Sequence, residues 1–136
     1  MDLLARMQNS LPPMIEMLGV ELVEVGPDRI VATMEAREQF GNGVGILHGG
    51  AYMTFADFLG ALGTVVNLPK GAGTTTIESK TNFIAPAKTG SRLKATSTPL
   101  HKGRRTMVWQ TRIESAEGRL LALVTQTQMV LEAQPD

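Results

Sequence analysis

A lone aspartate, Asp57, lies in an otherwise uncharged stretch that runs from Ala51 to Val66. The stretch fits a helix of roughly four turns at ~3.6 residues per turn. Its apolar residues cover every face, which is typical of a buried helix. Removing a carboxylate from water costs several kcal/mol unless the group is paired or protonated. We therefore expect Asp57 either to be satisfied by a structural hydrogen bond or to be kept for chemistry.

A glycine-rich loop, Asn42 to Gly50, comes directly before this helix. The first amides of a helix lack partners within the helix, and the helix dipole favours negative charge there. Gly49 and Gly50 carry no side chains that would block access to those amides. Amides that hold a developing oxyanion, with Asp57 as base or nucleophile, would make an active site. The alternative is structural, with a satisfied carboxylate and glycines that only turn the chain.

The composition limits the classes of function. The chain has 136 residues, which suits one domain over 1–136, and 43% of them are hydrophobic. Lys plus Arg balance Asp plus Glu at 13 each, so bulk charge does not indicate a nucleic-acid or membrane-surface partner. With no cysteine and two histidines outside any acidic cluster, we expect no disulfide, no metal site and no cofactor. The N-terminus lacks a signal-peptide pattern and the central helix is too short and glycine-rich for a membrane span, which indicates a cytoplasmic protein.

The remaining pattern predicts an α+β fold. An amphipathic helix over about 2–18 is broken at Pro12-Pro13, because proline is tolerated only in the first turn of a helix. Alternating and β-rich stretches between turn signals predict strands at about 20–25, 29–36, 74–84, 91–100, 104–115 and 119–131. Short turns between consecutive strands make the sheet antiparallel, and a helix that is apolar all round needs a sheet that wraps it. The residues expected mostly in the core are Met53, Phe55, Phe58, Phe83, Met107 and Trp109.

Three segments resemble a known family. They are Asn42-x5-His48-Gly49-Gly50-x6-Asp57, the strand end Asn82-Phe-Ile-Ala-Pro86-Ala-Lys-x-Gly90, and the turn Lys102-Gly103-Arg104. In this order and spacing they resemble hotdog-fold acyl-CoA thioesterases, most closely the PaaI-like type of phenylacetate degradation and of thioesterase superfamily member 2. The resemblance runs from about residue 15 to residue 131. It implies a long antiparallel sheet wrapped around the central helix, a homodimer joined sheet edge to sheet edge, dimers that pair into homotetramers, and an active site between subunits.

The resemblance also implies roles for catalytic residues. Asp57 falls at the position of the family's nucleophile or general base, and Gly49 at that of the amide that polarises the thioester carbonyl. Asn42 matches a residue that positions the thioester or the attacking water. Thr76 aligns with a hydroxyl residue contributed by the partner subunit. Some relatives carry a further hydroxyl residue where this chain has Ala61, so water positioning falls to Thr76, Asn42 or another group.

A second group of residues is predicted to bind substrate. His48 and Gly50 belong to the loop motif, and we expect the His48 ring to anchor the turn through a backbone hydrogen bond rather than to act as a base. Cationic side chains that could clamp the phosphates of coenzyme A are Lys88, Lys102, Arg104 and Arg105. Arginine forks suit phosphate geometry, which favours Arg104. The alternative for this cluster is a solvated charged surface.

We therefore expect an enzyme that hydrolyses an aromatic or medium-chain acyl-CoA to a free acid and CoA. Two alternatives remain open. One is a hydratase or dehydratase on the same fold, for which His48 with Asp57 would mimic the usual pair of a histidine and a carboxylate. The other is a non-catalytic acyl-CoA-binding protein.

Overall fold

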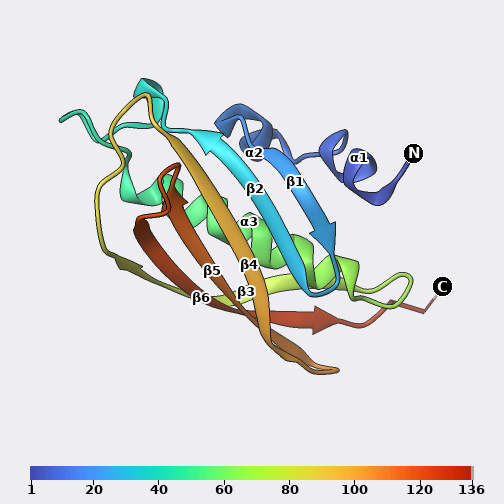
Figure 1. Cartoon of the computed structure of the whole chain (residues 1–136). Helices are drawn as coiled ribbons and strands as arrows, with labels where there is room; N and C mark the ends of the chain where they lie inside the picture. Colours follow the sequence, from blue (N-terminus) through green and yellow to red (C-terminus); the bar gives the residue numbers. More distant parts are fainter. Residues whose placement is uncertain (136) are drawn as a thin grey trace.

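The computed structural model describes residues 1–135 and confirms the predicted α+β order of elements (Figure 1). The helices are α1 (Leu3–Gln8), α2 (Pro13–Leu18) and α3 (Gly49–Val66), with the short 3₁₀ helix η1 (Glu38–Phe40) ahead of α3. The strands are β1 (Glu21–Gly26), β2 (Arg29–Glu35), β3 (Gly73–Phe83), β4 (Arg92–Lys102), β5 (Thr106–Ser115) and β6 (Leu120–Leu131). The predicted break at Pro12-Pro13 separates α1 from α2. None of these helices, within the part of the chain that the structure describes, has the length and hydropathy that a membrane span requires.

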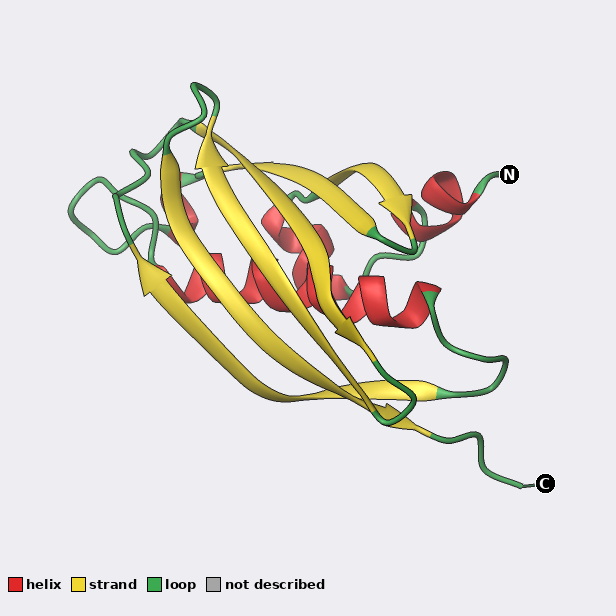
Figure 2. Cartoon of the chain, turned by 60° about the horizontal axis from the view of Figure 1, so that its bottom comes forward, coloured by secondary structure: helices red, strands yellow, loops and turns green. Residues whose placement is uncertain are grey.

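The six strands form one antiparallel sheet in the order β1-β2-β4-β5-β6-β3. β3 follows α3 in the chain but pairs with β6 at the far edge of the sheet. Figure 2 shows the long, twisted strands crossing over α3. The helix contacts every strand of the sheet. This is the wrapped arrangement that the sequence predicts, and it holds one face of α3 against the strands.

α3 approaches the sheet closely because two of its buried positions are glycines. A Cβ atom built at Gly63 would lie 2.6 Å from the Trp109 ring on β5. A Cβ atom built at Gly60 would overlap the side-chain amide of Gln126 on β6. Each glycine costs about 1 kcal/mol in helix propensity relative to alanine. The side chains that fill the rest of this contact are Tyr52, Phe55, Ala56, Leu59 and Leu62.

One side of α3 is not buried within the chain, and in this respect the prediction of a fully buried helix is wrong. Met53 is 40% exposed, and Asp57 and Ala61 on the same face are half-buried. These residues are spaced by four, so they form one stripe along the helix, which we call the open stripe. The physical reason is that one sheet covers only one side of a helix. Phe83, also expected in the core, is 54% exposed, whereas the predicted core residues that are buried are Phe55, Met107 and Trp109.

β3 forms a long edge of the sheet and pairs on one side only, with β6. Its register shifts between Thr76 and Glu78. Ile77 at this irregularity, Phe83 at the end of β3 and Ile84 just after it are each more than half exposed. An exposed apolar edge strand offers unpaired main-chain groups to another strand. The edge is therefore a candidate surface for a second chain.

Candidate active site

Asp57 and Thr76 meet where the middle of α3 faces the edge strand β3. Thr76 Oγ1 lies 2.6 Å from Asp57 Oδ1, and both residues are half-buried. The Thr76 hydroxyl points to α3, while the next residue, Ile77, is exposed. The resemblance implied that Thr76 reaches the site from the partner of the chain that supplies Asp57. The structure corrects this, because strand β3 carries Thr76 past Asp57 of the same chain.

Behind this pair lie two buried amides that the sequence reasoning missed, Gln126 and Gln128 of β6. Each is 1% exposed. Gln126 Nε2 lies 3.2 Å from Asp57 O, 3.4 Å from Asp57 Oδ1 and 2.9 Å from Gln128 Oε1. Gln128 Oε1 in turn lies 2.6 Å from Thr76 Oγ1. The available signal was the period of two in β6, which puts both glutamines on the buried face with Val124.

The first turn of α3 carries a free main-chain donor. His48 is the N-cap residue, and its Nδ1 accepts a hydrogen bond from Gly50 N–H at 2.8 Å, so the ring anchors the turn as predicted. This bond occupies the Gly50 amide and requires a neutral ring with its proton on Nε2. Ala51 N–H donates to His48 O at 2.9 Å. Gly49 N–H, in contrast, has no acceptor within residues 1–135, and its place at the helix start favours a negative group beside it.

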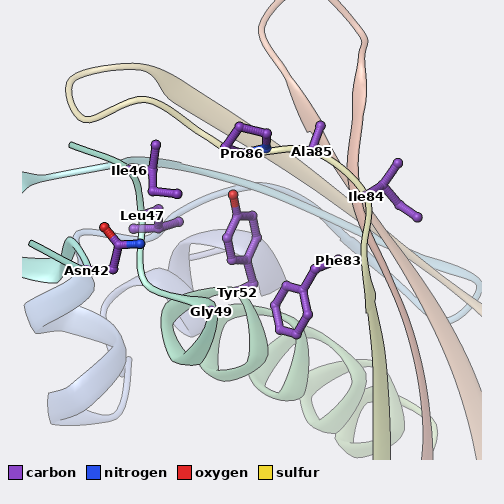
Figure 3. A pocket seen from close by; sticks show the side chains of 9 residues that line it. All are labelled: Asn42, Ile46, Leu47, Gly49, Tyr52, Phe83, Ile84, Ala85 and Pro86. Carbon is purple, nitrogen blue, oxygen red and sulfur yellow. The ribbon is translucent and has the colours of Figure 1, made fainter. Parts of the chain in front are cut away.

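A cavity of about 370 Å³ opens beside this amide (Figure 3). Asn42 lines it together with Gly49. Asn42 Oδ1 accepts from Val44 N–H at 3.0 Å, so the side-chain NH₂ group is the part of Asn42 that can donate to a ligand. The apolar and aromatic residues that line the cavity are Ile46, Leu47, Tyr52, Phe83, Ile84, Ala85 and Pro86. The predicted carbonyl-binding residues thus share one mostly apolar cavity.

Tyr52 places a phenol in the wall of this cavity. Its oxygen accepts a hydrogen bond from Ala87 N–H at 2.9 Å, and its ring meets Phe83 edge-on with centroids 5.8 Å apart. Burial raises the pKa of Tyr52 above its ordinary value, and the Ala87 N–H offsets part of that rise. The phenol is therefore neutral at physiological pH and keeps its proton as a donor.

The two predicted halves of the site do not meet within one chain. Gly49 and Asp57 are eight residues apart on the same helix. At ~1.5 Å per residue their backbones are separated by about 12 Å along the helix axis. A thioester carbonyl that accepts from Gly49 N–H cannot also lie beside Asp57 of that chain. One chain thus carries a carbonyl-binding half and a carboxylate half.

The predicted phosphate ligands lie in two places, Lys88 near the loop before α3 and the other three around the turn between β4 and β5. Lys102 Nζ is 2.6 Å from Asp28 Oδ1 and 3.4 Å from Asn67 Oδ1, so the turn between β1 and β2 already occupies it, which speaks against the predicted role. Lys88 is exposed and pairs through its backbone with Ile46 of the loop before α3. Arg104 and Arg105 are exposed at the turn between β4 and β5. Arg104 lines a second cavity of about 400 Å³, with Asn67, Leu68, Pro69 and Lys70, beyond the C-terminal end of α3.

The acidic and imidazole side chains are dispersed. Among the described residues no group of three or more His, Cys, Asp or Glu side chains could hold a metal ion. The groups that surround Asp57 are instead the hydroxyl of Thr76 and the amide of Gln126. Asp57 is therefore surrounded by hydrogen-bonding groups.

The N-cap gives a stability prediction. His48→Ala leaves Gly50 N–H without its acceptor, and we expect the free energy of unfolding to fall by about 1 kcal/mol. His48→Asn restores a side-chain oxygen that suits an N-cap, so this variant should stay close to the wild type. Urea unfolding of the three proteins measures the difference. Equal stability of the alanine and asparagine variants would contradict the anchoring role.

Known proteins resemble this chain in sequence. The model of the Thioesterase superfamily matches residues 44–122, which is more than half of the chain. A putative esterase of Haemophilus influenzae is 31% identical over 114 residues, which cover 84% of this chain and 82% of that protein. The 1,4-dihydroxy-2-naphthoyl-CoA hydrolase of Escherichia coli is 30% identical over 107 residues, which cover 79% of this chain and 78% of that protein.

Solved structures share the fold. A thioesterase from Haemophilus influenzae superposes with a TM-score of 0.86 at 28% identity, covering 98% of this chain and 90% of that chain. A hypothetical thioesterase from Streptococcus pneumoniae, solved with coenzyme A, gives 0.77 at 25% identity, covering 85% and 88%. The Escherichia coli PaaI protein from the phenylacetic acid degradation operon gives 0.86 at 22% identity, covering 96% and 93%, and so shares the fold. From the matched family model and the antiparallel sheet wrapped over one long helix, we conclude that the chain belongs to the thioesterase superfamily as a hotdog-fold thioester hydrolase.

Proposed function

We propose that the chain hydrolyses acyl-CoA thioesters at a site shared between two subunits. Asp57 and Thr76 come from one subunit, and Gly49 and Asn42 from the other. The observation that carries this proposal is a half-buried carboxylate held by a hydroxyl at 2.6 Å, on a helix whose first amide has no acceptor among the described residues. The family supplies the reaction class. A relative named as a naphthoyl-CoA hydrolase and a structure solved with coenzyme A support an acyl-CoA substrate.

The proposed chemistry follows from these groups. The thioester carbonyl oxygen accepts hydrogen bonds from Gly49 N–H and from the Asn42 NH₂ group, which stabilise the charge that develops on it. Asp57 takes a proton from a water held by Thr76, and the water oxygen attacks the carbonyl carbon. The C–S bond then breaks, CoA leaves as a thiolate that is reprotonated, and the free acid remains. In the alternative route Asp57 itself attacks, forming an anhydride that water then hydrolyses.

The edge strand and the open stripe support the shared site. Two β3 edges that pair about a twofold axis make the two α3 helices run in opposite directions. The start of one helix then lies alongside the middle of the other, which brings Gly49 of one chain toward Asp57 of the second. In this arrangement the open stripe, which carries Asp57 between Met53 and Ala61, faces the partner helix. From the family resemblance we also propose that two such dimers pair into a homotetramer.

For the acyl group we propose an aromatic ring or a medium-length chain. The cavity beside Gly49 is lined mostly by apolar side chains, with the rings of Tyr52 and Phe83 in its wall. Its volume of about 370 Å³ suits a group of this size. We propose that the reaction needs no cofactor, since the groups named above supply the base and the oxyanion donors. A CoA-linked substrate agrees with the cytoplasmic location that we also propose.

Replacement of Asp57 tests the carboxylate. We expect Asp57→Asn and Asp57→Ala to fold, since the side chain is half-buried, and to lose about 10²–10⁴-fold in kcat, as for loss of a general base. Thiol release from a panel of aromatic and medium-chain acyl-CoAs measures the loss. Unchanged turnover by purified Asp57→Ala would end this assignment. In ¹⁸O-labelled water, a single turnover that leaves the product acid unlabelled and labels the Asp57 carboxylate would show that Asp57 attacks the thioester and that water then cleaves the anhydride at the Asp57 carbon.

Replacement of Gly49 tests the oxyanion donor. Gly49 is the first residue of α3, where proline is tolerated, and His48 before it already has the extended backbone that precedes proline, with φ −64° and ψ 138°. Gly49→Pro thus removes the N–H with little change to the helix, and we expect kcat to fall by about 10²–10³-fold. Gly49→Ala is the matched control, because it adds a Cβ near the exposed Phe83 ring but keeps the N–H. Equal activity of the two variants would exclude the amide as the donor.

The same variants test whether the site is shared. Subunits of Asp57→Ala and Gly49→Pro, mixed after unfolding and refolding, form some dimers with one chain of each kind. Such a dimer has one site with both groups intact and one site with neither. We expect thiol release that neither parent protein shows. A mixture no more active than its parents would contradict the shared site.

Replacement of Arg104 tests the phosphate clamp. We expect Arg104→Ala to raise KM for acyl-CoA by about tenfold, the effect of losing a charge-assisted hydrogen bond. KM for the corresponding acyl-pantetheine, which lacks the nucleotide, should not change. Arg112→Ala is the control, since Arg112 is exposed and faces Glu114 on β5. Binding of free CoA that responds neither to salt nor to Arg104→Ala would refute the clamp.

A further inference from the structure

The Thr76 hydroxyl faces two oxygen atoms at the same distance. Thr76 Oγ1 lies 2.6 Å from Asp57 Oδ1 and 2.6 Å from Gln128 Oε1. A hydroxyl has one proton, so it can donate to only one of them. Two oxygens at 2.6 Å need a proton between them. Both contacts are satisfied at once only when a second proton sits between Asp57 and Thr76.

The surrounding amides fix the oxygen of Gln128 toward Thr76. Gln126 Nε2 donates to Gln128 Oε1 at 2.9 Å, and Gln128 Nε2 donates to Thr74 Oγ1 at 3.1 Å. If the Gln128 amide were reversed, its NH₂ group would face the NH₂ group of Gln126. Reversing Gln126 as well would turn its oxygen against Asp57 O and Asp57 Oδ1, at 3.2 and 3.4 Å. The network therefore has one consistent orientation, with an acceptor presented to Thr76.

The two glutamines beside Asp57 lower the stability of the fold. Gln126 and Gln128 are fully buried, and within residues 1–135 Gln126 Oε1 has no hydrogen-bond partner. A buried unsatisfied acceptor destabilises the fold. Position 60 must be glycine for the Gln126 amide to fit against α3. Buried apolar side chains in β6 would fill the same space without these penalties, so packing alone does not explain the two glutamines.

We propose that Gln128 is a positioning residue that stabilises the protonated form of Asp57 through Thr76, with Gln126 holding the Gln128 amide in place. With Asp57 ionised, the Thr76 proton points to Asp57 Oδ1. When the carboxylate takes a proton from the attacking water, that proton lies between Asp57 and Thr76, and the Thr76 proton turns to Gln128 Oε1. The proton gained by Asp57 is then held in a complete chain of hydrogen bonds, and no other group changes its charge. This inference rests on the proposed function of Asp57 as general base.

The test is a double-mutant cycle on kcat. Gln128→Met keeps the size of the side chain and removes the oxygen that faces Thr76. We expect kcat for acyl-CoA hydrolysis to fall about tenfold, the value of one hydrogen bond that forms only as the proton moves, with KM unchanged. The Thr76→Val variant lacks the hydroxyl that connects Gln128 with Asp57. Adding Gln128→Met to it should therefore cause no further fall in kcat. Thr111→Val is the matched control, because it removes a buried hydrogen bond to Ser97 elsewhere in the sheet, and kcat should stay at the wild-type value.

The outcomes separate this inference from the proposed function. Wild-type kcat in Gln128→Met, a change in KM alone, or losses that add to those of Thr76→Val would overturn the role of Gln128, while Asp57-dependent thiol release persists. A wild-type chain without Asp57-dependent thiol release would overturn the proposed function and this inference together. Should Gln128→Met not fold, Gln128→Asn keeps an amide in β6 but withdraws it by one methylene from Thr76. We expect Gln128→Asn to lower kcat by the same factor as Gln128→Met, and to cause no further fall in kcat when it is added to Thr76→Val.

Discussion

The rigidity of α3 is the constraint on which the rest of the site depends. A helix fixes the distance between its residues, so the Gly49 amide and the Asp57 carboxylate stay about 12 Å apart along the axis. Movement of loops cannot close that distance. An amide and a carboxylate of this fold can reach one carbonyl group only when two helices lie side by side. β3, whose outer edge pairs with no other strand of residues 1–135, is the element that we propose brings them together.

The side chains around Asp57 are polar but uncharged. No cation forms an ion pair with Asp57 within the described residues. A cationic partner would favour the ionised form and oppose uptake of a proton. Its neighbours are a hydroxyl and an amide, which donate hydrogen bonds without adding charge. The carboxylate is thus held by neutral hydrogen-bonding groups and not by a cation.

Local sequence patterns predicted most of the fold and named candidate residues for the site. The start of α3, the cap by His48 and the strand positions all rest on spacings of a few residues, which a sequence displays directly. Contacts that join distant segments were not predictable in this way. Gln128 meets Thr76 across 52 residues, and Lys102 meets Asp28 across 74 residues, through strand pairings that no local pattern specifies. The exposure of Met53 on α3 and of Phe83 on β3 was missed because the sequence shows that a residue is apolar, not which face of a helix or strand the rest of the chain covers.

The two buried glycines of α3 show how packing and chemistry share one helix face. Gly63 admits the Trp109 ring, so its cost in helix propensity is offset by burial of the largest side chain in the sheet. Gly60 bears the same cost and admits a polar amide instead, one that leaves an oxygen without a partner among the described residues. Residues that lower the stability of a fold are expected at positions where function requires them. Trp109 Nε1 likewise has no hydrogen-bond partner among the described residues, so an unpaired atom does not distinguish the two positions. They differ in what the admitted side chain contacts: Gln126 reaches Asp57, as its proposed role requires, whereas the Trp109 ring fills the interior.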